Sequence, residues 1–374
     1  RSVQDRADVE SVYRELTRAA GLRREVRVRV QDLFAGVPAG GMGIEYFLDD
    51  PTGGALTLFV MSGGQVRTIE SVWTAGHADL LGQITDFMRL RFGTGSATAA
   101  RWLQGALRDL WDVLLAPVAQ DLPHNETLVL APGAMLNAVP FEILLDPEGR
   151  LLWEMADLRF RVGAPVLRRT APKPRRRREA LLLQGGDEGQ GSGAPATNGL
   201  PHADREHRGL EERLRQRGWH VRVMDAADPT GLRAVARADL IHFAGHATFA
   251  TDHGMSSRLA LHSGGIRAVD ILDWPLRRHP LVVLAGCDTG NAESRGDEFV
   301  GFVRSVLGAG AGALVASTRP AHDEAAAHLV AAFYDAWLAG DEPHRALALA
   351  ARRVRGMAGF AHPFFWSGFR CFGV

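Results

Sequence analysis

Cysteine is scarce in this chain, whose 374 residues contain only Cys287 and Cys371. Small secreted domains held together by disulfides are far richer in cysteine, so we expect two free thiols in a reducing, cytoplasmic setting. No Cys-x-x-Cys pair or clustered histidine spacing occurs either, which argues against a zinc site built on thiolates. The sequence therefore predicts no metal and no cofactor.

Long apolar runs and a net charge are also absent. No apolar stretch approaches the roughly 20 residues that span a bilayer, and the polar start does not resemble a signal peptide. Lys plus Arg equals Asp plus Glu at 43 each, which predicts no direct contact with nucleic acid and none with an acidic membrane. The chain begins with Arg1 rather than Met, so we expect a fragment of a longer protein with an upstream region.

Two short apolar segments are the most informative part of what is present. One runs from Leu240 to His246 and the other from Leu281 to Cys287. Each has the length and composition of a buried strand and is predicted to break at a glycine just before its reactive side chain. Continuous apolar runs are typical of parallel strands buried on both faces. In such sheets ligands bind at the carboxyl ends of the strands, which makes His246 and Cys287 a candidate site.

Alternating strand and helix patterns in the second half predict a doubly wound, mostly parallel sheet flanked by helices. The first half predicts a smaller α/β subdomain with strands separated by glycine-rich turns. The expected strands are 45–48, 55–61, 65–72, 127–131, 180–183, 219–224, 240–246, 281–287 and 313–317. The expected helices are 3–20, 78–92, 99–115, 203–217, 230–237, 297–307, 323–338 and 342–355.

These patterns divide the chain into an N-terminal subdomain at 1–165, a basic linker at 166–179 and a second domain at 180–374. The linker prediction rests on a run of Arg and Lys with two prolines, which cannot bury apolar area. A processing site and a contact with an anionic partner are the alternatives for this run. Residues 185–199 and 247–267 are expected to form long surface loops.

Ordered motifs in the second half resemble the CHAT protease domain, a mainly bacterial relative of caspases and separase. The matching segments are 242–246, 285–290, 296–298, 308–315, 333–334, 346–347 and 362–369. In the first half, 44–47, 128–132 and 140–141 resemble the region that often precedes this domain. The resemblance implies a caspase-like fold, cysteine endopeptidase activity and a protein substrate.

The chemistry assigns a role to each reactive residue. A thiolate is the attacking species, and an ordinary cysteine with a pKa near 8.5 is mostly protonated at neutral pH. His246 would take the proton of Cys287 and later deliver one to the leaving amine. Backbone N–H groups around Gly245, Ala247 and Gly286 would stabilise the oxyanion. His242 is interpreted as a structural residue and Cys371 as a core residue.

Three further residues are candidates for the substrate cleft. Several arginine- or lysine-specific relatives carry an acidic residue two positions before the nucleophile, where this chain has Ala285. We therefore expect a small or uncharged residue before the scissile bond. Asp288 either contacts the substrate backbone or stabilises its loop. A tryptophan that is frequent in relatives is absent here, and Arg319 stands near its place. Ala247 stands where the family often has glycine.

Two other functions compete with a protease that is regulated by an upstream region or an activator protein. A catalytically silent interaction scaffold with the same fold is the main alternative, although a scaffold need retain neither reactive side chain. Nucleotide binding is the other, because 308–312 is rich in glycine. That segment precedes an expected strand, however, whereas a phosphate-binding loop follows a strand and opens a helix.

Overall fold

A computed structural model describes residues 36–89, 96–161, 178–185, 201–224, 233–248, 257–261, 265–287, 296–319 and 321–373. The helix expected at 3–20, nearly all of the basic linker and the loop at 186–199 lie outside these residues, as does 230–232. Where elements are described, the expected strands and helices of both halves are confirmed, with ends that differ by a few residues.

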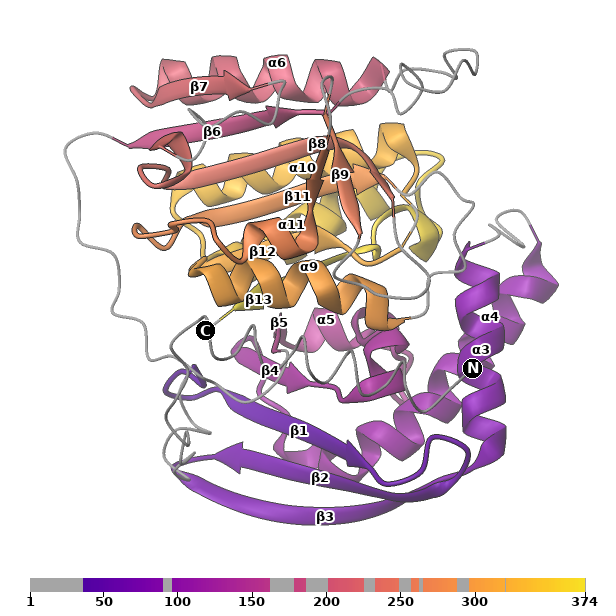
Figure 1. The fold of residues 1–374 in the computed structure, drawn as a ribbon. Coiled ribbons are helices and arrows are strands. Elements are labelled where there is room, and N and C mark those ends of the chain that lie inside the picture. Colours follow the sequence, from indigo (N-terminus) through magenta and orange to yellow (C-terminus); the bar gives the residue numbers. More distant parts are fainter. Residues whose placement is uncertain are drawn as a thin grey trace, which may run out of the picture.

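The described strands form one mixed sheet of 13 strands (Figure 1). They are β1 (Met42–Leu48), β2 (Gly54–Ser62), β3 (Gln65–Trp73), β4 (Thr127–Ala131), β5 (Asp157–Phe160), β6 (Glu179–Gln184), β7 (His220–Met224), β8 (Leu240–Thr248), β9 (Arg258–Ala260), β10 (Gly265–Arg267), β11 (Leu281–Cys287), β12 (Ala313–Ser317) and β13 (Phe369–Gly373). Their order is β10-β9-β8-β11-β12-β13-β5-β4-β1-β2-β3, with β6 paired to β8 and β7 paired to β6. Most neighbours are parallel, which confirms the predicted fold class.

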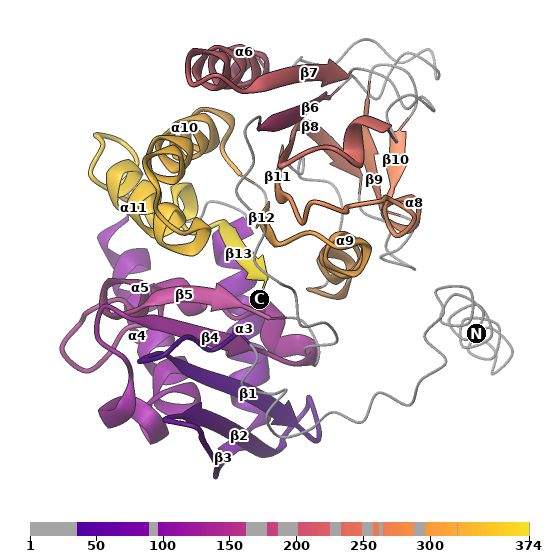
Figure 2. The same cartoon turned by 90° about the vertical axis from the view of Figure 1, so that its left-hand side faces the viewer.

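Helices flank this sheet, and in its second half they cover both faces. They are α3 (Ala75–Arg89), α4 (Ala97–Leu114), α5 (Leu152–Met155), α6 (Pro201–Gln216), α8 (Ala268–Ile271), α9 (Gly296–Ala309), α10 (Asp323–Ala339) and α11 (Pro343–Arg355), with short 3-10 turns at Ala116–Asp121, Ala134–Ala138, Phe141–Ile143 and Pro363–Phe365. In the second half, α10 and α11 lie on one side of the sheet and α8 and α9 on the other (Figure 2). The central strands β8 and β11 are therefore enclosed on both faces, as their continuous apolar sequences require.

Two local predictions were wrong. Neither reactive segment breaks at its glycine, because β8 continues through Gly245 to Thr248 and β11 continues through Gly286 to Cys287. The segment 247–267 was predicted to be a loop, but its described residues include β9 and β10, which pair in an antiparallel hairpin. The hairpin extends the sheet because β9 pairs with the last two residues of β8. Backbone pairing across the hairpin thus replaces the expected open loop.

The last strand of the chain joins the two halves of the molecule. Strand β13 runs antiparallel to β12 and parallel to β5, where Phe372 faces Phe160. Neither β5 nor β13 was predicted, since each is short. The division at 1–165, 166–179 and 180–374 remains a prediction, because the strands on its two sides belong to one sheet.

A buried ion pair fastens this junction. Arg370 on β13 is 4% exposed and donates through Nε to Oε1 of Glu142 at 2.5 Å. Its other nitrogens donate to the backbone carbonyls of Asn137, at 2.6 Å, and Val139. Removal of either partner would leave a buried charge without compensation, which is far more costly than the loss of an exposed ion pair.

Candidate active site

The two reactive residues lie opposite each other on neighbouring strands. Strands β8 and β11 are parallel, and their register pairs Cys287 with His246 and Gly286 with Gly245. Adjacent strands of a sheet are about 4.8 Å apart, so the backbone brings the two residues to one point of the carboxyl edge. His246 is partly exposed there. A partly exposed imidazole beside a cysteine on the next strand is an arrangement that suits nucleophilic catalysis.

Glycine at position 245 is required by the approach of another strand end. A Cβ atom on Gly245 would lie 2.5 Å from the Cα of Gly185, which follows β6, and a Cβ on Gly185 would meet Gly245 at 2.4 Å. The amide of Gly185 donates to the carbonyl of Ala244 at 3.0 Å. Close packing of two backbones, rather than a sharp turn, therefore explains this glycine next to His246.

Other residues predicted for the site fall in several places. Ala285 is 6% exposed within β11 and faces Ala244, so it is part of the sheet's interior. Ala247 is partly buried and pairs with Leu259 of β9, so the hairpin covers the backbone beyond His246. Asp288 lies outside the described residues.

Arg319 lies beyond the end of β12, on the other side of β11 from His246. The last registered pair of these strands is Leu284 with Ala316, and three further residues along each strand lead to Cys287 and Arg319. The Arg319 guanidinium donates to the carbonyl and the hydroxyl of Ser367. Burial lowers the pKa of Arg319 to about 10, which leaves it a cation at neutral pH. Because Ser367 is buried, the guanidinium nitrogen that contacts it points toward the interior.

A buried polar cluster supports β8 four residues before His246. His242 is 0% exposed, and its Nδ1 lies 3.0 Å from the hydroxyl of Tyr334 on α10. Its Nε2 lies 3.0 Å from Oε1 of Glu206 on α6. The two atoms are not oriented for a hydrogen bond, and neither has another hydrogen-bond partner among the described residues. Sequence reasoning identified His242 alone, because nothing in the local patterns around Glu206 and Tyr334 indicates that they meet it.

Burial disfavours charge on this cluster. Desolvation lowers the pKa of His242 to about 3, and it raises the pKa of Glu206 well above its ordinary value, with a further contribution from the charge of Asp323. Both shifts favour the uncharged forms, so burial disfavours an ion pair between these side chains despite their short separation. The cluster therefore joins α6, β8 and α10 through neutral groups.

The second thiol has the properties of a core residue, as predicted. Cys371 is free, 2% exposed and located on β13. Burial raises the pKa of its thiol to about 12, so it is protonated at all physiological pH values. This thiol is unreactive because it is buried, whereas a nucleophilic cysteine is accessible and lies beside a base.

Two features of other kinds of site are absent from the described residues. No group of three or more His, Cys, Asp or Glu side chains is arranged to hold a metal ion. No described helix combines the length and the apolar character needed to cross a membrane.

Solved structures place this architecture in a known class. The separase–securin complex of Saccharomyces cerevisiae, solved at 3.0 Å, matches with a TM-score of 0.58 at 9% identity, over 92% of this chain and 30% of that chain. A 2.6 Å structure of the same complex matches with a TM-score of 0.55 at 8% identity, over 92% and 31%. The Arg-specific cysteine proteinase gingipain R gives 0.41 at 12% identity, over 79% and 74%. The two separase matches show that the chain has a caspase-like α/β fold, and the chain spans about three-tenths of the length of the separase chain.

The family follows from the sequence itself. The model of the CHAT domain matches residues 104–374. Because this match covers well over half of the chain, the chain belongs to the CHAT domain family. The match begins within α4, so it includes residues 104–165 of the predicted N-terminal subdomain and the basic linker. No curated protein matched the sequence.

Proposed function

We propose that this chain is a cysteine endopeptidase in which Cys287 is the nucleophile and His246 the general base. The observation that carries the proposal is the register of β8 and β11, which sets Cys287 directly opposite His246 at the carboxyl edge. Cysteine proteases need a thiolate and a positioned base, and the fold supplies neighbouring positions for both. Membership of the CHAT family supports this assignment.

The proposed reaction begins when His246 removes the thiol proton and the sulfur attacks the scissile carbonyl. A bond forms between sulfur and carbon while the carbonyl oxygen becomes an oxyanion. We assign the backbone amides of Cys287 and of position 246 or 247 as donors to that oxygen, beside Gly245 and Gly286. The imidazolium then protonates the leaving amine, and water releases the acyl group from the enzyme.

The proposed substrate is a specific protein cut after a small or uncharged residue. The absence of an acidic side chain at Ala285, two positions before Cys287, supports this choice. A library of peptides that vary at the residue before the scissile bond tests it. Cleavage only after arginine or lysine would contradict the assignment.

Control of the protease by an upstream region or an activator protein is part of the proposal, as is a cytoplasmic location in a bacterial cell. The two-cysteine content supports a reducing compartment, where the thiolate of Cys287 survives. Cleavage in the basic linker is an alternative means of activation. A single intact band on a denaturing gel of fully active protein would argue against that alternative.

The decisive experiment measures the rate at which iodoacetamide alkylates Cys287 between pH 5 and pH 9, with peptide mapping. An assembled dyad predicts rapid labelling that extends to acidic pH, because His246 stabilises the thiolate. Cys371 is an internal control, since it is buried and its pKa is raised to about 12.

Two variants complete this test. His246→Ala should return the labelling of Cys287 to the rate and pH dependence of an ordinary thiol. His220→Ala removes an exposed histidine at the opposite edge of the sheet and should change nothing. Slow labelling that is insensitive to His246→Ala would instead support the silent scaffold.

A further inference from the structure

Arginines line the edge of the sheet opposite to the candidate active site. Strands β7, β6, β8 and β11 are parallel and all begin at this amino edge, where backbone hydrogen bonds connect their first residues. Exposed arginines stand just before each of the four strands. We call these residues the arginine row: Arg178, Arg217, Arg233, Arg237 and Arg277.

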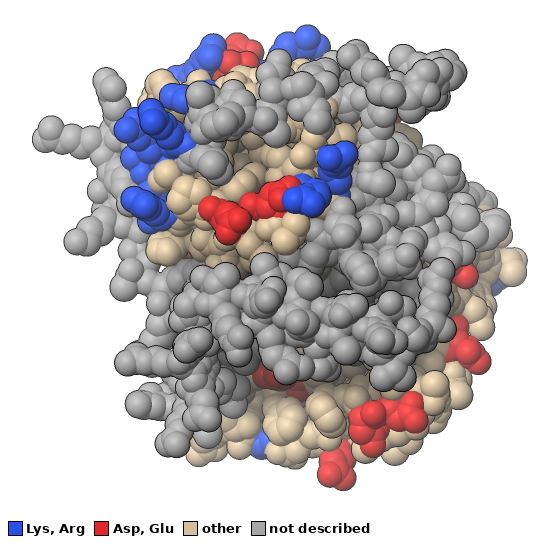
Figure 3. Space-filling view, viewed as in Figure 1, with Lys and Arg blue, Asp and Glu red and all other residues tan. Residues whose placement is uncertain are grey.

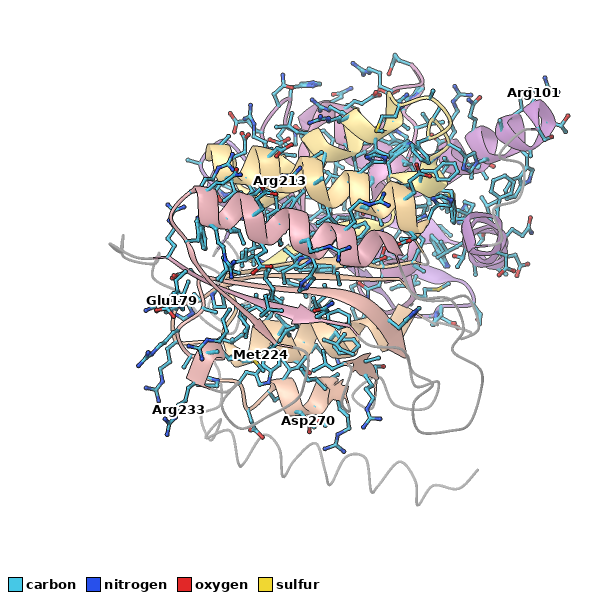
Figure 4. The ribbon with its side chains drawn as sticks, turned by 90° about the horizontal axis from the view of Figure 1, so that it is seen from above. Arg101, Glu179, Arg213, Met224, Arg233 and Asp270 are labelled. Carbon is cyan, nitrogen blue, oxygen red and sulfur yellow. The ribbon has the colours of Figure 1, made fainter. Side chains whose placement is uncertain are left out.

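The figures show the same concentration of charge. In Figure 3, basic side chains gather along the left margin of the upper half, where β8 and β11 begin in Figure 1. Figure 4 shows Glu179 and Arg233 at one side of the molecule, with Arg101 at the far side. Arg233 thus lies on the side of the molecule where β6 begins, away from Arg101.

Two acidic residues of this edge are paired with an arginine outside the row. Glu179 and Asp239 both bind Arg278, at 3.3 Å and 3.1 Å, and these contacts use the two carboxylates at the start of β6 and β8. Among the described residues, no ion pair involves any member of the arginine row. A balanced charge for the whole chain is thus compatible with a strongly positive local surface.

The row also has features that favour phosphate over a protein surface. Arg178 is held in position over the ring of Trp219, with its guanidinium carbon 5.4 Å from the ring centre. Trp219 itself is only 7% exposed, so its ring offers little surface to anchor a protein partner. Stable protein interfaces depend on such apolar anchors, whereas contacts with a phosphate backbone are mainly electrostatic and use arginine forks.

We propose that the arginine row binds the phosphate backbone of nucleic acid, without base specificity. Strands spaced about 4.8 Å apart set cations at intervals that allow several phosphates to be contacted at once. This surface lies away from Cys287, so binding would hold the protease on a polyanion while its candidate active site stays accessible. The balanced charge of the whole chain predicted no contact with nucleic acid. The proposal differs from that prediction because the attraction of a polyanion depends on the local electrostatic field of the surface.

Fluorescence anisotropy with a labelled 20-base-pair DNA duplex tests the proposal on the full chain. We expect dissociation constants on the order of 10⁻⁴ to 10⁻⁶ M near physiological salt, and tighter binding at 50 mM NaCl. The triple variant R178Q/R237Q/R277Q should weaken binding at least tenfold at 50 mM NaCl. It should also reduce the slope of log affinity against log salt by about 2.7, which is the contribution of three phosphate contacts.

The matched control is R101Q/R108Q/R205Q, which removes the same charge from exposed arginines elsewhere. It should retain the affinity and salt slope of the unmodified chain, and circular dichroism should show both triple variants folded. No binding at 50 mM NaCl, or equal losses in both variants, would overturn the proposal. A polyglutamate peptide of equal charge that binds as tightly as the duplex would also overturn it, in favour of an acidic protein segment.

Discussion

Strands β1–β3 bury one face of the sheet, whereas strands β8 and β11 are buried on both faces. The first three are antiparallel, and one face carries buried residues such as Ile44 and Leu58, while Phe47 and Val72 on the other are 57% and 67% exposed. Strands β8 and β11 are parallel and enclosed on both faces, so polar residues such as His242 are buried with them. The comparison shows that a substitution on β1–β3 affects one face, whereas one on β8 or β11 affects core packing wherever it points.

The largest expected effect concerns the junction between these regions, where Arg370 of β13 pairs with Glu142. Arg370→Met should lower the free energy of unfolding by about 3–5 kcal/mol, because Glu142 would remain buried without its partner. Arg67→Met on β3 breaks an ion pair with Asp121 in which both side chains are about half exposed, at 48% and 47%, and should cost about 0–1 kcal/mol. Urea unfolding measures both. Equal losses would mean that the junction is no more sensitive than the surface.

Two valines test the comparison directly. Val283 on β11 is 0% exposed and Val72 on β3 is 67% exposed. Val283→Thr buries a hydroxyl in an apolar layer and should destabilise by about 1–3 kcal/mol. Val72→Thr should change stability by less than about 0.5 kcal/mol. Thermal unfolding compares the two, and similar shifts in Tm would contradict the difference between one-sided and two-sided burial.

Two glycines extend the comparison to backbone packing. Gly245→Ala places a methyl group against Gly185 and should cost about 1–3 kcal/mol through overpacking. Gly105→Ala, in helix α4 beneath the outer strands, meets nothing within 4 Å and should stabilise by about 0.5–1 kcal/mol. Denaturant midpoints with unchanged slopes would report these effects. A stabilised Gly245→Ala would show that the two strand ends separate readily.

The buried carboxyl of Glu206, which contacts His242 of β8, predicts that the free energy of unfolding depends on pH. The pKa of Glu206 is raised in the folded state above its ordinary 4.5, so the unmodified chain should lose stability relative to Glu206→Gln as pH rises above 4.5. His242 acts in the opposite direction, since its pKa of about 3 lies below the ordinary 6.5 and stability is lost as pH falls below 6.5.

Urea unfolding between pH 4 and pH 8 measures how the difference in unfolding free energy between the unmodified chain and Glu206→Gln changes with pH. Glu70→Gln removes one charge at an exposed position of β3 and controls for the change in net charge. A constant difference between the unmodified chain and Glu206→Gln over this range would show that Glu206 is not held neutral.

The sequence by itself determined the strand-and-helix order and the candidate dyad. Apolar runs are local properties, so they located β4, β11 and β12 to the residue. They also placed Cys287 at the end of β11 and His246 within two residues of the end of β8. Resemblance to the CHAT family supplied the chemistry. Short strands such as β5, β9, β10 and β13 carried too few residues to show a period.

Only the tertiary structure decided which distant residues meet. Tyr334 reaches His242 across 92 positions and Arg370 reaches Glu142 across 228, and no local pattern encodes such contacts. The same holds for Gly185 against Gly245 and for the arginine row, whose members come from separate connections before β7, β6, β8 and β11. Periodicity records whether a residue is buried, whereas its partner is fixed by the packing of strands and helices far apart in the chain.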